Sequence, residues 1–206
     1  MKPTVFILLP VHNRRAVTER FIDCLTAQSY PTYHLVLIDD GSDDGTAQMV
    51  RAKVRNLSVI RGRGNWWWAG CLQQGVNWLE ANRVDDSEIV LLMNDDVIID
   101  KEFLAEAVRR LESLRGTLLL PQVIDKKSEL PEESGLTANL KQLTFEQASS
   151  AETMNCLPTR GLFLRMGDLR RIGGFHPRML PHYLSDYEFT IRAHRKGFRL
   201  ATYPTL

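Results

Sequence analysis

Two short apolar runs, each followed directly by a pair of aspartates, constrain the fold of this chain more than any other feature. The first, Leu-Val-Leu-Ile at 35–38, leads into Asp39 and Asp40, and the second, Ile-Val-Leu-Leu-Met at 89–93, leads into Asn94, Asp95 and Asp96. Apolar runs bounded by polar turn residues are typical of buried parallel strands. Ligands bind open α/β sheets at the carboxyl ends of such strands, so the four carboxylates are expected at one sheet edge. Because carboxylates repel one another unless a cation or a hydrogen-bonding ligand is present, the pattern indicates a site for a metal-bound, phosphate-bearing substrate.

Strand-like and helix-like segments alternate through the first half of the chain. Strands are predicted at 4–11, 35–39, 57–61 and 89–93, and helices at 14–28, 45–53, 71–81 and 101–114. Asp100 is predicted to cap the last of these helices, and Ser42 or Asp43 the second. This alternation predicts an α/β fold with a doubly wound, mostly parallel sheet flanked by helices.

The second half is less regular. Further strands are predicted at 118–123, 161–165 and 198–203, and helices at 166–171 and 185–196. The stretch 125–151 is polar and aperiodic, and it predicts a long loop or an irregular hairpin. Long loops in compact domains often serve as lids over a site.

Composition indicates one cytoplasmic domain. A length of 206 residues is enough for a single domain with a substantial core, and a net charge of +1 favours neither nucleic acid nor an anionic membrane as partner. Cys24, Cys71 and Cys156 have no metal-binding spacing and no disulfide framework, so we expect reduced, buried thiols. The apolar opening segment is too short to span a membrane and lacks a cleavage site.

Four motifs, in order along the chain, resemble those of the family 2 glycosyltransferases. They are Pro10-Val11-His12-Asn13, the Asp-Asp-Gly-Ser-Asp-Asp-Gly-Thr stretch at 39–46, Met93-Asn94-Asp95-Asp96-Val97, and Gly173-Gly174-Phe175 followed by Ser185-Asp186-Tyr187-Glu188 and Arg192. The resemblance implies the GT-A fold of nucleotide-diphospho-sugar transferases over the single domain 1–206. Residues 1–100 would form the nucleotide-sugar-binding half, and 101–206 the acceptor-side half, with a small C-terminal acceptor-side portion that is a candidate for truncation.

The implied activity is an inverting, metal-dependent transfer of a sugar from a UDP-, dTDP- or GDP-linked donor to a glycan or lipid-linked saccharide. Asp96 is predicted to bind Mn²⁺ or Mg²⁺, because hard oxygen ligands suit these ions. Asp186 is predicted to be the base that deprotonates the acceptor, kept ionised by the helix N-terminus, with Glu188 as second candidate. The residues predicted to bind the nucleotide sugar are Pro10, His12, Asn13, Asp40, Asp43, Asn65, Trp68, Asn94 and Asp95. A carboxylate such as Asp40 can accept the N–H groups of uracil, thymine or guanine.

This chain departs from the family pattern in three places. Trp67 stands where relatives usually have glycine, and Gln73 where they have asparagine. Ser185 replaces the glutamate that usually precedes the catalytic aspartate, and the chain ends at Leu206, before a histidine that can reach the metal in many relatives. Among Trp66, Trp67 and Trp68, core packing and a role in a sugar pocket are both open for each ring.

Other classes of protein remain as alternatives. A nucleotide-sugar-binding module without turnover would fit Ser185 and the early chain end. A sugar-phosphate nucleotidyltransferase would need a Gly-rich opening loop, which Pro10-Val11-His12-Asn13 does not provide. A flavodoxin-like domain would leave the match from Gly173 to Arg192 unexplained. Nothing indicates nucleic-acid binding, and a peripheral association with the inner face of the membrane stays open.

Overall fold

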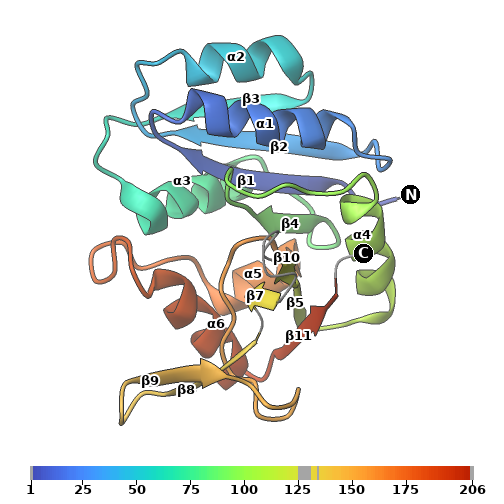
Figure 1. The fold of residues 1–206 in the computed structure, drawn as a ribbon, viewed down its shortest axis with the longest axis vertical. Coiled ribbons are helices and arrows are strands. Elements are labelled where there is room, and N and C mark those ends of the chain that lie inside the picture. The colour runs from blue at the N-terminus through green and yellow to red at the C-terminus, as the bar shows by residue number, and fades with distance from the viewer. Residues whose placement is uncertain (1, 125–130, 134, 205–206) are drawn as a thin grey trace.

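The computed structural model describes residues 2–124, 131–133 and 135–204. Within them, seven strands form one mixed sheet in the order β11-β5-β10-β4-β1-β2-β3 (Figure 1). Their bounds are β1 Val5–Val11, β2 Tyr33–Asp39, β3 Leu57–Arg61, β4 Ile89–Leu92, β5 Thr117–Pro121, β10 Leu162–Arg165 and β11 Arg199–Tyr203. Strand β10 runs antiparallel to both of its neighbours, and the other six strands are parallel to one another. The predicted α/β fold with a mostly parallel sheet is therefore confirmed.

Helices cover both faces of the sheet because successive strand residues point to opposite faces. In β1, Ile7 and Leu9 belong to one buried cluster and Leu8 to the other. The first cluster contains side chains from α1 (Arg15–Thr26), α2 (Thr46–Lys53) and α4 (Phe103–Ser113). The second contains side chains from α3 (Trp67–Ala81), α5 (Met166–Ile172) and α6 (Ser185–Arg195). This is the doubly wound arrangement that the alternation of elements predicts.

The stretch predicted as a long loop or irregular hairpin contains ordered strands. Strand β6 (Val123–Ile124) pairs with β7 (Pro131–Glu133), and β8 (Leu136–Asn139) pairs with β9 (Thr144–Gln147). Residues 125–130 lie outside the described residues. The β8–β9 hairpin projects beyond α6 in Figure 1, and its Phe145 ring lies 5.1 Å from the ring of Tyr187. The loop alternative is thus wrong for 136–147, where a hairpin is anchored by this ring contact.

Two helices begin elsewhere than predicted. Helix α3 begins at Trp67 rather than at Cys71, because the turn before it is held from another strand by Asp40, as described below. Helix α4 begins at Phe103, since Asp100 accepts a hydrogen bond from the Glu102 N–H (2.7 Å) and shapes a turn instead of the first helical residue.

The N-cap position of α2 is Gly45, and the side chain that bonds the first helical N–H is that of the preceding Asp44, not of Ser42 or Asp43. The Asp44 carboxylate accepts the Thr46 N–H (3.0 Å) and the Arg15 N–H (2.9 Å), so it joins α2 to the start of α1. The Thr46 hydroxyl also donates to this carboxylate and lowers its pKa.

Replacing Asp44 by alanine is expected to lower the free energy of unfolding by about 1 kcal/mol, the usual contribution of a cap. A carboxylate whose pKa is lower in the folded state contributes stability above its unfolded pKa, and loses it as pH falls through the folded pKa. Urea denaturation should therefore show a difference between wild type and variant that shrinks below about pH 4. Asp43→Ala, at an exposed neighbouring position, is the control and should change stability by less than about 0.5 kcal/mol. Equal losses in both variants would contradict the assignment.

Candidate active site

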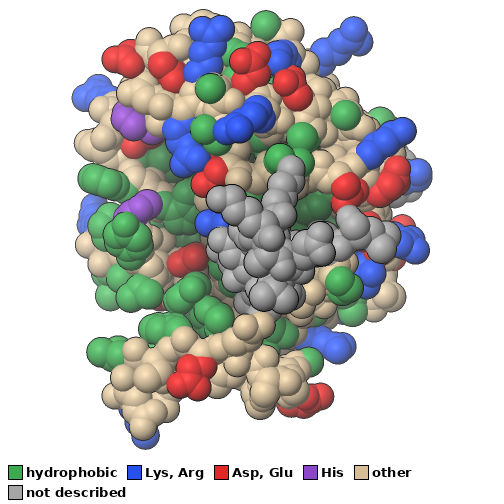
Figure 2. Space-filling view, in the orientation of Figure 1, with side chains coloured by type: hydrophobic (Ala, Val, Ile, Leu, Met, Phe, Trp, Pro, Cys, Tyr) green, Lys and Arg blue, Asp and Glu red, His purple; other side chains and the backbone are tan. Residues whose placement is uncertain are grey.

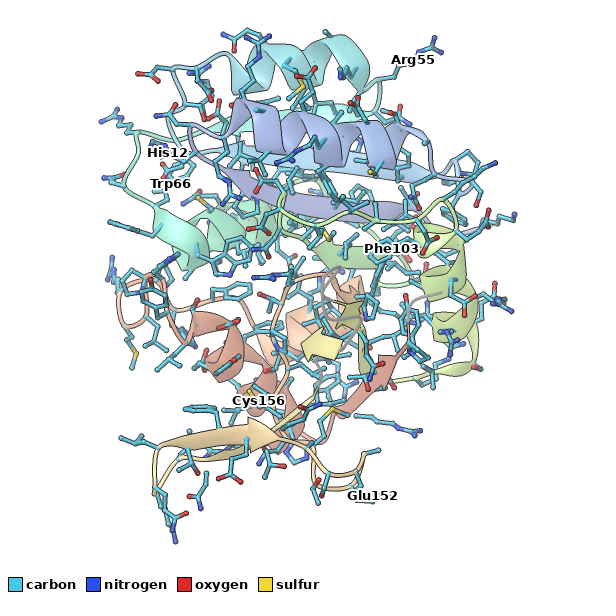
Figure 3. All side chains as sticks on the ribbon, viewed as in Figure 1. His12, Arg55, Trp66, Phe103, Glu152 and Cys156 are labelled. Atoms are coloured by element: carbon cyan, nitrogen blue, oxygen red, sulfur yellow. The ribbon has the colours of Figure 1, made fainter. Side chains whose placement is uncertain are left out.

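A cavity of about 330 Å³ opens at the carboxyl ends of β1, β2 and β4 and at the start of α3. It is lined by Pro10, Val11, His12, Arg14, Asp40, Gly64, Trp67, Trp68, Cys71, Asn94, Asp95 and His182. Of the residues predicted from sequence, Pro10, His12, Asp40, Trp68, Asn94 and Asp95 line the cavity, whereas Asn13, Asp43, Asn65, Asp96 and Asp186 do not. Figure 3 shows His12 and Trp66 close together at this edge of the sheet.

Asp40 organises the loop that forms one wall of the cavity. It is 5% exposed, and its two carboxylate oxygens accept the N–H groups of Gly64 and Trp66, both at 2.8 Å. A side chain at position 62 would come within 2.3 Å of the same carboxylate, so this close approach requires Gly62. Each oxygen keeps a further lone pair for a ligand. The backbone carbonyl of Asp40 lies 2.6 Å from Nδ1 of His12, which positions that ring at the cavity.

Asn13 and Asp43 connect two loops. Asn13 donates its N–H to the Ser42 hydroxyl (3.0 Å), and its side-chain oxygen accepts the Asp43 N–H (2.9 Å). The backbone of Asn13 is left-handed, with φ of 48°. The structure therefore gives Asn13 a bracing position between the end of β1 and the loop after β2. Asp43 and Asn65 are exposed outside the cavity wall.

Asp95 and Asp96 share one cationic partner. Nε of Arg14 lies 3.3 Å from Asp95, and Nη2 of Arg14 lies 3.2 Å from Asp96. Asp95 is 5% exposed and also accepts the Thr18 hydroxyl at 2.7 Å. Burial raises the pKa of Asp95, while Thr18 and Arg14 act in the opposite direction. Asp96 is more open, with 37% of its side chain exposed.

These residues suit a divalent cation that arrives with phosphate. No group of three or more His, Cys, Asp or Glu side chains is placed to hold a metal among the described residues. Mg²⁺ and related hard cations are often bound by one or two carboxylates together with substrate phosphates and water. The exposed carboxylate of Asp96, beside Asp95, supplies carboxylate oxygens for such an ion. The two carboxylates are already paired with one cationic group, the guanidinium of Arg14.

Asp186 lies at the start of α6, one turn after His182 on the cavity wall. One carboxylate oxygen accepts the Tyr187 N–H at 2.9 Å. Burial raises the pKa of Asp186, whereas this hydrogen bond and the charges of His182 and Arg160 lower it. The predicted net lowering of the pKa of Asp186 is thus wrong, because desolvation outweighs the backbone N–H groups at the start of the helix. A carboxyl with a raised pKa is a better proton acceptor than an ordinary aspartate.

The Gly-Gly-Phe segment and Arg192 form a clasp that holds α6 against α3 and α5. Arg192 donates to the carbonyls of Ile172 and Gly174, both at 2.7 Å, and its guanidinium is also paired with Glu188. Gln73 of α3 accepts the Phe175 N–H at 2.7 Å. Glu188, the second candidate for the base, is therefore engaged in the clasp. The departures at two motif positions also have a local explanation here, since Gln73 makes this contact and the Ser185 hydroxyl donates to the His182 carbonyl at 2.7 Å.

The sequence did not single out several cavity residues. Arg14 follows a recognised motif directly, but its partners are 81 and 82 residues away, so no local signal reveals the pairing. His182 belongs to none of the sequence motifs, and it forms part of the cavity wall. Arg14 is the arginine that lines the cavity, whereas Arg61, Arg63 and Arg160 do not line it.

The architecture and the motifs define a glycosyltransferase of the GT-A class. The glycosyl transferase family 2 profile matches residues 6–170 of this chain. The chain therefore belongs to glycosyl transferase family 2, which confirms the family predicted from its motifs.

Known proteins of this kind resemble the chain over nearly its whole length. Glycosyltransferase AglE of Haloferax volcanii is 23% identical over 208 residues, which cover 96% of this chain and 64% of that protein. The mannosyltransferase PcManGT of Pyrobaculum calidifontis, solved with GDP-Man and Mn²⁺, superposes with a TM-score of 0.72 at 20% identity over 99% of this chain and 55% of its own. TarS of S. aureus, residues 1–349 with UDP-GlcNAc, gives 0.71 at 18% identity over 98% of this chain and 56% of its own. This chain thus spans between about half and two thirds of each relative.

Proposed function

We propose that this chain transfers a sugar from a nucleoside diphosphate sugar to a saccharide acceptor, with inversion at the anomeric carbon. The observation that carries the proposal is the cavity itself, which brings Asp40 from the end of β2 and Asn94 and Asp95 from the end of β4 into a single site. Solved relatives of the same fold hold GDP-Man with Mn²⁺ or UDP-GlcNAc, which supports a nucleotide sugar as ligand.

The residues divide into three roles. Asp40 and His12 hold the nucleoside at the ends of β1 and β2, and Asp95 and Asn94 hold the sugar-phosphate part beside β4. Asp96 is the carboxylate that would bind Mn²⁺ or Mg²⁺, and the ion, when bound, neutralises the charge that develops on the leaving diphosphate. Asp186 takes the proton of the acceptor hydroxyl, in agreement with its raised pKa.

Arg14 is expected to compete with a metal ion for Asp95 and Asp96. Replacing it by methionine leaves the two carboxylates without their cation, so the affinity for Mn²⁺ in the absence of nucleotide should rise about fivefold, equivalent to about 1 kcal/mol for partly exposed ion pairs. Mn²⁺ titration followed by electron paramagnetic resonance measures this directly. Arg15→Met removes the same charge one residue away and is the control. The competition would be contradicted if Arg14→Met bound Mn²⁺ no more tightly than wild type does.

Proton NMR of the reaction tests the proposed function. UDP-glucose, dTDP-glucose and GDP-mannose are each incubated with the protein, Mn²⁺ and a panel of methyl glycosides. The proposal expects release of one nucleoside diphosphate and a new glycosidic bond of inverted anomeric configuration. A retained configuration would contradict the inverting mechanism, and nucleotide binding without turnover of any donor would favour the alternative, a nucleotide-sugar-binding module.

The setting of the reaction is part of the proposal. Cys24, Cys71 and Cys156 are free thiols, as in proteins of the reducing cytoplasm. No helix in the described part of the chain is long and apolar enough to cross a membrane. On the basis of the free thiols, we propose that the reaction takes place in the cytoplasm, at the inner face of the membrane where the acceptor is lipid-linked.

A further inference from the structure

Trp67 holds a strained backbone conformation without the burial that would compensate for it. Its φ is 56°, in the left-handed region that bulky side chains rarely occupy. The residue is 61% exposed, so most of its ring gains nothing from the core. Strained residues of this kind concentrate at ligand-binding sites, where the conformation aims a side chain. The strain at Trp67 therefore indicates that the ring serves ligand binding and not the stability of the fold.

The strained backbone directs the Trp67 ring to the wall of the cavity, against His182. The two ring centroids lie 5.8 Å apart with an angle of 52° between the ring planes, and both residues line the cavity. The His182 ring also meets the ring of Tyr183 edge-on, with 4.6 Å between the ring centroids. Three rings thus form a continuous aromatic ledge, defined here as Trp67, His182 and Tyr183.

Two hydrogen bonds to backbone carbonyls hold the ledge in place. The Ala69 N–H donates to the Pro181 carbonyl at 3.0 Å, which joins the first turn of α3 to the loop before α6. The Ser185 hydroxyl donates to the His182 carbonyl at 2.7 Å and anchors the other end of that loop. The rings are therefore presented by two segments that are fixed to each other.

The lining of the cavity combines polar and aromatic residues. Asp40, Asn94 and Asp95 offer polar groups, whereas Trp67 and Trp68 offer ring carbons. Hydrophobic side chains gather along the left edge of the molecule in Figure 2, where the loop before α6 lies in Figure 1, and Tyr183 in that loop is 83% exposed. A ligand that matches both sets of residues has hydroxyl or phosphate groups and also a face of C–H groups. A hexopyranose ring has such a face and stacks on aromatic side chains.

We propose that Trp67, braced by His182, is a stacking platform for a hexopyranose ring and determines which sugar the site accepts. The inference rests on the proposed function and adds a specificity-determining residue to it. The same stacking chemistry would serve the sugar of the donor or the terminal sugar of the acceptor, and the experiment below separates these sources.

The test compares wild type with Trp67→Gly, which removes both the ring and the strain, and with Trp67→Phe, which keeps an aromatic ring. Met179→Ala removes an exposed apolar side chain from the loop before α6, which carries His182, and is the matched control. Calorimetry with Mn²⁺ measures the binding of UDP and UDP-GlcNAc, dTDP and dTDP-glucose, and GDP and GDP-mannose. The affinity for methyl glucoside, methyl galactoside and methyl mannoside is then measured on protein saturated with the nucleotide that binds.

If the donor sugar stacks on Trp67, the gain in affinity from nucleoside diphosphate to nucleotide sugar falls about fivefold or more in Trp67→Gly. If the acceptor sugar stacks there, that gain is unchanged and the affinity for a methyl glycoside falls by a similar factor. In either case Trp67→Phe restores part of the loss, Met179→Ala has no effect, and Trp67→Gly melts no lower than wild type.

Three results would overturn the inference. These are unchanged sugar affinities in Trp67→Gly, an equal loss of affinity for the nucleoside diphosphate alone, and a lower melting temperature showing that the ring supports the fold. Failure of wild type to bind any of the three nucleotides is a different outcome, since it removes the proposed function on which the inference depends.

Discussion

Asp186→Asn is expected to lower the turnover number by about 10²–10⁴-fold, the usual contribution of a general base, while the affinity for nucleotide stays within about twofold. Asparagine has nearly the same shape and can still accept the Tyr187 N–H through its side-chain oxygen, so α6 should keep its start. The variant loses only the capacity to take a proton. Steady-state rates together with nucleotide titration separate this loss from a binding defect.

The pH dependence of the rate follows from the burial of Asp186. The base acts when it is ionised, so kcat/KM should rise with pH through a pKa above the ordinary aspartate value of 3.8. Glu188→Gln is the control, because Glu188 is paired with Arg192 in the clasp. It should lose stability and keep this acidic limb of the profile. A rate lost in Glu188→Gln and retained in Asp186→Asn would reverse the assignment of the base.

Stability should change in the opposite direction from activity at position 186. A carboxyl whose folded pKa lies above its unfolded pKa contributes stability that is fully present below the unfolded pKa and is lost as pH rises through the folded pKa. At neutral pH, ionised Asp186 therefore opposes folding. Asp186→Asn should melt at a higher temperature than wild type at pH 7, and calorimetric melting at pH 3 should show the difference reduced.

Asp40→Ala is expected to have the largest effect on the fold. It removes both acceptors that hold the Gly64 and Trp66 N–H groups, and hydrogen bonds to a charged acceptor contribute about 1.5–3 kcal/mol each. Since such contributions are not additive, we expect a loss of about 3 kcal/mol in the free energy of unfolding. The wall formed by 62–66 should also loosen, so nucleotide binding should fall below detection.

Urea denaturation and nucleotide titration of Asp40→Ala measure both effects. Asp43→Ala changes a carboxylate in the same Asp-Asp-Gly-Ser-Asp stretch, but one that is exposed and outside the cavity. It is expected to change stability by less than about 0.5 kcal/mol. An Asp40→Ala protein that is as stable as wild type would show that the loop after β3 does not depend on this carboxylate.

The elements that could be predicted from sequence are those with a local signal. The buried runs before Asp39 and Asn94 indicate parallel strands, and the carboxyl ends of these strands do meet at one edge. The direction of β10 could not be read, because a short apolar strand looks the same in either orientation. The start of α3 at Trp67 could not be read either, since Asp40, on another strand, holds the preceding turn.

In the candidate site, too, the features with a local sequence signal could be predicted and those that depend on distant residues could not. Motif positions such as Pro10, Asp40 and Asn94 lie on the cavity wall because strand ends carry them there. The pairing of Arg14 with Asp96 joins residues 82 positions apart and depends on the pairing of β1 with β4, the strands that these residues follow. Whether a carboxyl has a raised or lowered pKa depends on burial, which is why the sequence pattern gave the wrong direction for Asp186.

The central claim is that this cavity binds a nucleoside diphosphate together with a divalent metal at Asp96. Calorimetric titration of UDP, dTDP and GDP, each with and without Mn²⁺, on wild type and on Asp96→Ala tests it most directly. We predict that one of the three nucleotides binds, that its affinity depends on Mn²⁺, and that this dependence is lost in Asp96→Ala. Binding of none of the three, or Mn²⁺-dependent binding that survives in Asp96→Ala, would contradict it.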